Sequence, residues 1–254
     1  MCRVFLWILL ALPAVAQAQT FASIILKPAR PGNSRLRVLP DGELIARAIP
    51  VIRLLSYAYD VPVNPSPRLS ALPGWAAQEQ YDIDAKPLPN AMPYSPQQMI
   101  RGLLDDRFHL VLRTENKSMA VYALTIASGG PKLEKSETDC ASETCHNFAG
   151  GLGHPLIARA IDMDDLASYI SNWTDLPVLN RTALSGLFTV NTEGWIPMRL
   201  PPPPPNTTLA ADPFAGLPTI FTVLGKLGLG LKRQEATLPV YTVEHIERPA
   251  FNQQ

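Results

Sequence analysis

The residues best suited to chemistry lie in one short segment, where two cysteines and a histidine stand together. Cys140 and Cys145 bracket Ala-Ser-Glu-Thr, and His146 follows directly. Such a group is typical of a disulfide, of covalently attached haem, or of a zinc site that also uses His154. The four residues between the thiols exceed the two of the usual haem motif, and thiols in an oxidising compartment form disulfides. We therefore predict a Cys140–Cys145 disulfide, with no cofactor and no metal.

Hydrolytic motifs do not occur in this sequence. It contains neither a Gly-x-Ser-x-Gly elbow nor a His-Glu-x-x-His helix. His109 and His245 lie in segments that alternate polar and apolar residues, which favours structural histidines in strands. The acidic run 105–106 ends one predicted helix, and the run 162–165 begins another, where carboxylates stabilise the positive end of the helix dipole. We predict no catalytic residue, although a triad assembled from distant segments would leave no such motif.

The first eighteen residues have the three parts of an export signal. Arg3 supplies positive charge, Val4 to Val15 is nearly all apolar, and Ala16-Gln17-Ala18 is a small-x-small cleavage pattern. A membrane anchor is the alternative, but a span needs about 20 apolar residues and this run is shorter. We expect cleavage after Ala18 and a secreted or periplasmic product with no membrane span.

Composition limits both the fold class and the partners. The chain has 254 residues, of which 46% are hydrophobic and 17% charged, and it contains 26 prolines. These values exclude a disordered chain and a long helical bundle. Basic and acidic residues number 22 each, so no net charge attracts nucleic acid or an anionic membrane. We therefore expect no nucleic-acid partner.

An internal duplication organises the chain. The segment Leu44-Ile45-Ala46-Arg47-Ala48-Ile49 recurs letter for letter at 156–161, and identities at this offset of 112 continue to residue 57. Weaker identities follow at an offset of 119 near the end of each half. We predict two α+β repeats, at 19–135 and 156–254, joined by a connection at 136–155 that is rich in cysteine and glycine.

Each repeat is predicted to contain a strand, a helix, a second strand, a second helix and a hairpin. In the first repeat these elements are 44–48, 50–59, 81–85, a helix capped by Ser95, and strands 110–113 and 121–126. In the second they are 156–161, a helix capped by Asp162, 188–191, 218–227, and strands 229–233 and 240–246. The predicted fold class is α+β, with two tandem copies of this unit and helices packed on mixed sheets.

A proline-rich insertion at 195–213 distinguishes the second repeat from the first. Its five consecutive prolines, Pro201 to Pro205, favour a polyproline helix. Such a helix binds aromatic-lined grooves, and a stiff surface loop is the alternative.

Several short stretches, spread over the mature chain, are those of a known family. They include Ile52–Tyr59, Pro73–Trp75, Leu103–Phe108, Thr182–Phe188 and Leu227–Leu231. On these stretches the chain resembles an uncharacterised secreted family of soil-associated acidobacterial proteins, a domain of unknown function that often occurs as many paralogues. The resemblance implies family membership and a bacterial source, but no activity, ligand or catalytic residue.

A second resemblance concerns the second half alone. Met163–Val190 followed by Ile220–Ile246 is similar to the short N-terminal domain of secretins and TonB-dependent receptors. The shared order is a helix, a Pro-Val strand, a glycine-containing turn, a strand, and a helix ending in Leu-Gly-Leu before a hairpin. Those domains are periplasmic interaction modules, so the resemblance implies a binding role.

Two classes of function follow from these observations. The first is a non-enzymatic exported binding or sensory module of the bacterial cell envelope, whose protein partner binds a sheet edge or the proline-rich loop. The alternative is an envelope hydrolase or peptidoglycan-modifying enzyme. A cleft with convergent polar groups favours the enzyme, whereas two small sheets without a shared pocket favour the module.

Overall fold

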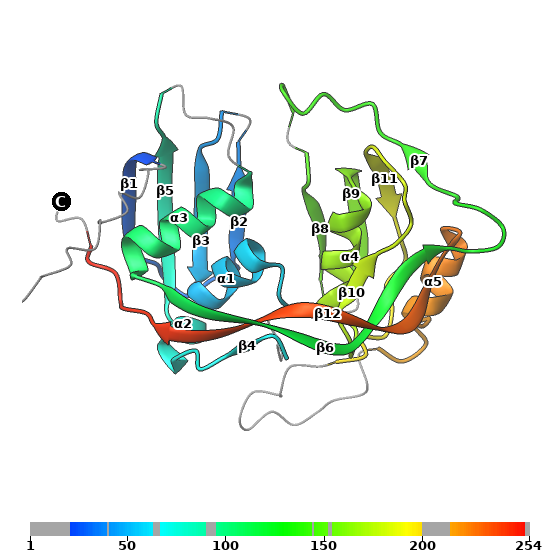
Figure 1. Ribbon diagram of the computed structural model, residues 1–254. Helices are drawn as coiled ribbons and strands as arrows, with labels where there is room; N and C mark the ends of the chain where they lie inside the picture. The colour runs from blue at the N-terminus through cyan, green and yellow to red at the C-terminus, as the bar shows by residue number, and fades with distance from the viewer. Residues whose placement is uncertain are drawn as a thin grey trace, which may run out of the picture.

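The chain folds into two α+β lobes joined by a long two-stranded ribbon (Figure 1). The computed structural model describes residues 21–39, 41–62, 67–89, 95–143, 145–151, 154–199 and 214–251. The predicted signal segment 1–18 and the prolines Pro201–Pro205 lie outside the described residues. Within the described part of the chain, no helix has the length and apolar character needed to cross a bilayer.

The first lobe is a four-stranded antiparallel sheet with helices α1 and α3 on one face (Figure 1). Its strand order is β1-β5-β3-β2. Apolar side chains from α1 and α3 pack on buried positions of β3 and β5 to form one core. The elements are β1 (Phe21–Pro28), β2 (Arg35–Val38), β3 (Leu44–Pro50), α1 (Val51–Tyr59), α2 (Gly74–Gln78), β5 (Gln80–Pro87) and α3 (Pro96–Phe108).

The second lobe is also a four-stranded antiparallel sheet, with the strand order β7-β11-β9-β8. Helices α4 and α5 contribute apolar side chains to its separate core, which includes Leu156, Ile170 and Leu224. The elements are β7 (Glu134–Lys135), β8 (Phe148–Gly151), β9 (His154–Ile161), α4 (Met163–Ser171), β11 (Phe188–Asn191) and α5 (Ile220–Lys226).

The helix starts follow the local sequence closely. Ser95 and Asp162 cap their helices as predicted, each within a capping box, so their side chains satisfy backbone N–H groups that lack helical partners. Pro50, which was predicted at the first helical position, lies one residue earlier as the cap of α1. Its ψ of 153° is extended, and β3 therefore continues through Pro50 before the helix begins.

The ribbon corrects the prediction of a hairpin at the end of each repeat. The segments 110–126 and 229–246 do not fold back on themselves; each forms one continuous strand, β6 (Val111–Ile126) and β12 (Leu229–His245). These strands pair with each other in antiparallel register over their whole length. The middle residues of both strands are polar and mostly exposed between the lobes. A polar stretch between two apolar ones is also typical of a hairpin turn, which is why the sequence predicted one.

Each end of the ribbon belongs to a different core. Leu124 and Leu229 are buried in the second lobe, whereas Val243 is buried in the first. Two short strands, β4 (Leu69–Ser70) and β10 (Val178–Asn180), pair in parallel with β12 and β6 and complete a mixed sheet of order β10-β6-β12-β4. The ribbon therefore anchors both lobes.

The two histidines predicted in strands have different positions. His245 is in β12 as expected. His109 is not in a strand, because it caps the C-terminus of α3 with a left-handed φ of 48° and donates its N–H to the Asp105 carbonyl. A residue in that conformation ends a helix, and the following alternation of polar and apolar residues hid this boundary.

Gly228, just after α5, lies at a tight contact between the second lobe and the turn that follows β6. Its φ of 69° is left-handed, and a Cβ there would overlap the Gly130 carbonyl oxygen. The turn after β6 hydrogen-bonds this segment, because Ala127 N–H donates to the Gly228 carbonyl and Lys132 N–H to the Leu227 carbonyl.

We predict that Gly228→Ala lowers the free energy of unfolding more than Gly186→Ala does. Gly186 also has a positive φ but open space around it, so its substitution costs only the left-handed strain of about 1–2 kcal/mol. Gly228→Ala adds an overlap with backbone, which costs about 1–3 kcal/mol more. Urea unfolding of both variants measures the difference, and equal losses would contradict the predicted overlap.

Candidate functional site

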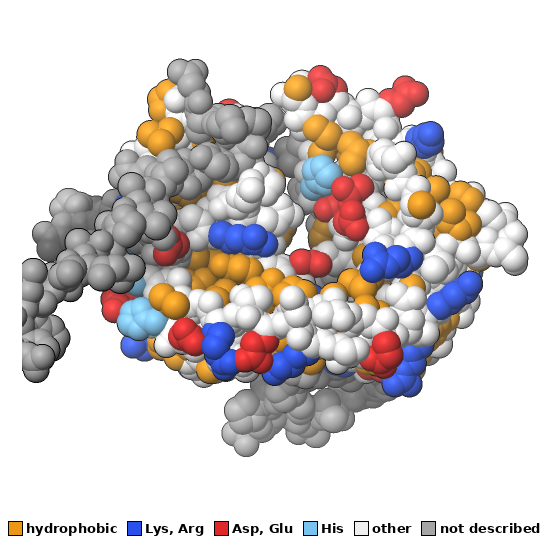
Figure 2. All heavy atoms as spheres, in the orientation of Figure 1, with side chains coloured by type: hydrophobic (Ala, Val, Ile, Leu, Met, Phe, Trp, Pro, Cys, Tyr) orange, Lys and Arg blue, Asp and Glu red, His pale blue; other side chains and the backbone are white. Residues whose placement is uncertain are grey.

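A cleft of about 790 Å³ lies between the two lobes. One wall comes from β2, α1 and the start of α3, and the other from the disulfide loop, β8 and α4. Figure 2 shows this hollow, with a histidine and acidic side chains on one side and a basic side chain on the other. Polar groups from both lobes thus converge on one space.

The first-lobe wall carries three arginines and one carboxylate, that of Asp60. Arg35 and Arg37 come from the edge strand β2, and Arg53 comes from the middle of α1. No ion pair joins these three guanidinium groups to a carboxylate of the described residues. The Arg53 side chain remains exposed, yet loss of surrounding water in the cleft lowers the pKa of its guanidinium.

The second-lobe wall is mainly acidic. Glu143 lies in the disulfide loop, and Asp162, Asp164 and Asp165 lie at the start of α4. Desolvation raises the pKa of the Asp162 carboxyl, and the hydrogen bond from the Asp165 backbone N–H opposes this shift. Arginines therefore outnumber carboxylates on the first-lobe wall, and carboxylates outnumber basic groups on the second-lobe wall.

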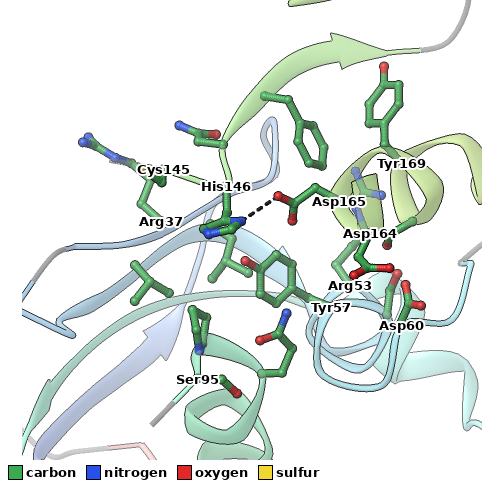
Figure 3. Close-up of a pocket in the computed structure, with 18 of the residues that line it drawn as sticks. Arg37, Arg53, Tyr57, Asp60, Ser95, Cys145, His146, Asp164, Asp165 and Tyr169 are labelled. Carbon is green, nitrogen blue, oxygen red and sulfur yellow. Dashed lines mark hydrogen bonds and ion pairs between the residues drawn. The ribbon is translucent and has the colours of Figure 1, made fainter. Parts of the chain in front are cut away.

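His146 forms the closest polar contact in the cleft. Its Nδ1 lies 2.6 Å from Oδ2 of Asp165 (Figure 3). The hydrogen bond to this carboxylate raises the pKa of the His146 imidazole above 6.5. The backbone fixes the position of the ring, because His146 has a left-handed φ of 54° and its N–H donates to the Ala160 carbonyl at 2.8 Å.

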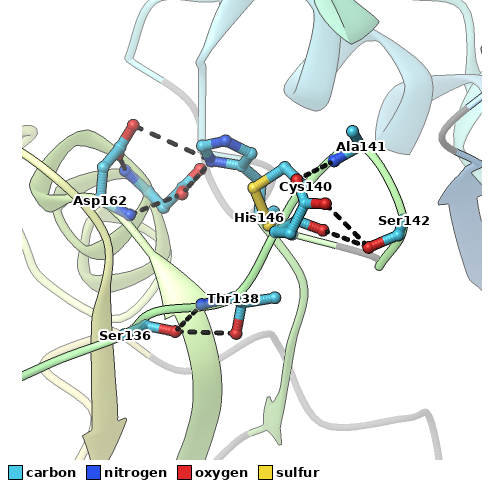
Figure 4. Close-up of a disulfide and its surroundings, with 10 residues drawn as sticks. Ser136, Thr138, Cys140, Ala141, Ser142, His146 and Asp162 are labelled. Carbon is cyan, nitrogen blue, oxygen red and sulfur yellow. Dashed lines mark hydrogen bonds and ion pairs between the residues drawn. A yellow bond between two sulfur atoms is a disulfide. The ribbon is translucent and has the colours of Figure 1, made fainter.

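The predicted disulfide between Cys140 and Cys145 is confirmed, and it positions His146 (Figure 4). The Cα atoms of the pair are 5.4 Å apart, and Asp139 accepts hydrogen bonds from Ala141 and Ser142 within the loop. Because both sulfur atoms are bonded to each other, they form neither haem thioethers nor thiolate ligands for zinc. The side chain of His154, the remaining zinc candidate, lies outside the described residues.

His146, Asp162 and Asp165 have ligand atoms within 4.8 Å of one another, which is the spacing of a metal site. Hydrogen bonds of a helix cap account for this arrangement. Oδ1 of Asp162 accepts from the N–H groups of Asp164 and Asp165, and Oδ2 of Asp165 accepts from Asp162 N–H. The positive end of α4 repels a cation, and the His146 imidazole does so whenever it is protonated. The group is therefore a capping box with a histidine counter-ion.

Tyr57 brings the first lobe to the His146–Asp165 pair. Its ring points toward them from α1 (Figure 3). Burial raises the pKa of the Tyr57 hydroxyl, and the Asp165 charge raises it further. Within the described residues, the His146 ring is hydrogen-bonded to no serine or threonine hydroxyl. The arrangement can donate hydrogen bonds and bind charge.

The sequence pointed to only part of this site. It singled out His146 only as a neighbour of the two cysteines and read the acidic run 162–165 as a helix start, and it did not single out the arginines or Tyr57, which match no motif. One signal was available, because a Ser-Tyr pair recurs at the offset of 112. Both copies line the cleft, Ser56-Tyr57 from α1 and Ser168-Tyr169 from α4.

A known protein family matches most of this chain. The family described as "Protein of unknown function (DUF3738)" matches residues 52–246. The chain belongs to this family. The DUF3738 match extends from α1 to the end of β12, so it includes the α1 wall, the disulfide loop and α4, but not β2. No curated protein and no solved structure matches this DUF3738 chain.

We predict that His146→Gln destabilises the protein mainly at acidic pH. The folded-state pKa of His146 is raised, so its protonated form stabilises the fold below pH 6.5, and this contribution is lost as pH rises through the folded-state value. The pair is partly exposed, so the loss is about 0.5–1 kcal/mol. Unfolding measured at pH 5.5 and pH 9 provides the check; a loss of equal size at both would show that the ion pair contributes nothing.

Proposed function

We propose that this protein is a non-enzymatic binding or sensory module of the bacterial cell envelope, and that its partner enters the cleft between the lobes. The observation that carries this proposal is the pair of oppositely charged walls around one shared space. Its volume is in the range of ligand sites, about 300–1,000 Å³. Arginines that form no ion pair within the described part of the chain on one wall, and carboxylates on the other, favour a partner that carries charge of its own.

Export is part of this proposal. The signal pattern in residues 1–18 supports cleavage after Ala18 and a secreted or periplasmic location. The Cys140–Cys145 disulfide supports an oxidising compartment. The resemblance to acidobacterial secreted proteins agrees with such a location.

We also propose that the lobes descend from one duplicated unit, with repeats at 19–135 and 156–254 and a connection at 136–155. The corresponding sheet orders β5-β3-β2 and β11-β9-β8 support this origin. The strand pair Leu36–Ala46 corresponds to Phe148–Ala158 at the offset of 112, so the structural equivalence begins at β8, inside the segment 136–155. A duplicated unit explains why the cleft is lined by equivalent helices. The likeness of the second half to the N-terminal domain of secretins and TonB-dependent receptors supports a role in interaction.

An envelope hydrolase is the second candidate, and one observation favours it. His146, Asp165 and Tyr57 converge in the cleft, and burial or hydrogen bonding shifts the pKa values of His146 and Tyr57. Such groups transfer protons in many enzymes. We rank this candidate lower because the His146 hydrogen bond goes to a helix-capping carboxylate within the second lobe.

The experiment compares binding of an envelope extract to the mature chain and to two tryptophan variants. Ser56→Trp places a large side chain in the cleft, whereas Ser118→Trp places it on the exposed middle of the ribbon. We predict that the wild type and Ser118→Trp retain the same protein partner and that Ser56→Trp loses it, because the cleft is filled.

The outcome that reverses the ranking is equally specific. Turnover of an ester, peptide or glycan substrate that His146→Ala abolishes, together with no retained partner, would establish the enzyme in place of the binding module. Retention of the partner by Ser56→Trp would place the binding surface outside the cleft.

A further inference from the structure

The edge strand β2 is the part of the cleft best suited to hold an extended peptide. It is the last strand in the order β1-β5-β3-β2, so only β3 pairs with it among the described strands. All four of its residues, Arg35–Val38, line the cleft. A sheet edge offers unpaired backbone N–H and C=O groups, and an extended chain can add to it as a further strand.

The hydrogen-bond pattern shows which backbone groups face off this edge. Leu39 N–H donates to the Glu43 carbonyl at 2.9 Å, so Leu39 faces β3. In an antiparallel pair, successive residues alternate between facing the partner strand and facing away from it. In this register the backbone N–H and C=O groups of Arg37 point toward β3, while those of Leu36 and Val38 point away from it.

The side chains of β2 give this edge a charge pattern. Arg35 and Arg37 are exposed and two residues apart, so they project from the same face of the sheet. On β3, Arg35 is opposite Arg47, whose own guanidinium pairs with Asp84 at 2.7 Å. Among the described residues, no carboxylate forms an ion pair with either β2 arginine. Opposite charges on neighbouring strands stabilise pairing, and like charges oppose it.

This charge pattern selects among the occupants of the edge. A second copy of the chain, paired through β2, would bring two arginine pairs together, which is unfavourable. A folded sheet would meet the second lobe, because Asn147 and Phe148 at the β8 edge line the same cleft. A single extended segment with acidic side chains avoids both problems, because its charge is opposite to that of the arginines and it is narrow enough to fit beside the second lobe.

We propose that the partner adds an extended peptide to β2 as a fifth strand, with aspartate or glutamate at two alternate positions beside Arg35 and Arg37. This inference rests on the proposed binding function and specifies the chemistry of the bound segment. Backbone hydrogen bonds to Leu36 and Val38 hold the segment, and the two arginines select its sequence.

The first test uses two capped eight-residue peptides, one alternating glutamate with valine and the other alternating lysine with valine. We expect the full mature chain to bind the glutamate peptide and not the lysine peptide, as measured by calorimetry. The double variant Arg35→Glu with Arg37→Glu should reverse this preference. Lys27→Glu changes charge on β1, the opposite edge of the same sheet, and should leave it unchanged.

The second test addresses the backbone. Val38→Pro removes the N–H that faces off the edge but leaves the bonds to β3 intact, so the sheet should persist. Val38→Ala keeps this N–H and serves as the matched control. We expect Val38→Pro to weaken binding of the glutamate peptide about tenfold and Val38→Ala to change it less than about threefold. Circular dichroism and thermal unfolding establish that both variants fold.

The results separate this inference from the proposed function. If Ser56→Trp abolishes partner binding but neither peptide binds, or if Val38→Pro binds as well as Val38→Ala, strand addition at β2 is wrong and the cleft remains the binding site. If Ser56→Trp retains the partner and neither peptide binds, both proposals are wrong.

Discussion

The antiparallel pairing of β6 with β12 is the constraint on which the rest of the structure depends. These strands come from opposite halves of the chain, yet they pair from end to end and carry both lobes. Because the ribbon spans the distance between two separate cores, the lobes do not merge into one hydrophobic interior. The space between them is bounded by edge strands and helix ends, and these elements supply polar and charged groups.

The start of α4 shows how one set of side chains meets two requirements. Asp162 and Asp165 cap the helix, which satisfies its first N–H groups. The same carboxylates give the second-lobe wall its negative charge and bind His146. The disulfide restricts the loop before His146, so a segment without regular secondary structure presents the imidazole at a defined position. Local stability and site geometry are therefore linked here.

The parts that the sequence predicted are those governed by local rules. The helix caps at Ser95 and Asp162 and the disulfide each depend on residues a few positions apart. The ribbon depends on pairing between segments more than a hundred residues apart, and its exposed polar middle resembles a loop. The site residues Arg53 and Tyr57 share no motif with His146, because only the arrangement of the lobes brings them together.

The burial of Val243 in the first lobe has a consequence for folding. Residues 21–110 provide nearly all of that core, but its last buried side chain lies more than a hundred residues further along the chain. Contacts of such high sequence separation carry a large loop-closure entropy and slow the folding reaction. During synthesis, which begins at the N-terminus, the first sheet can form early. Its core is complete only when Val243 has been added, after the residues of the second lobe. Completion of the two lobes is thus kinetically coupled.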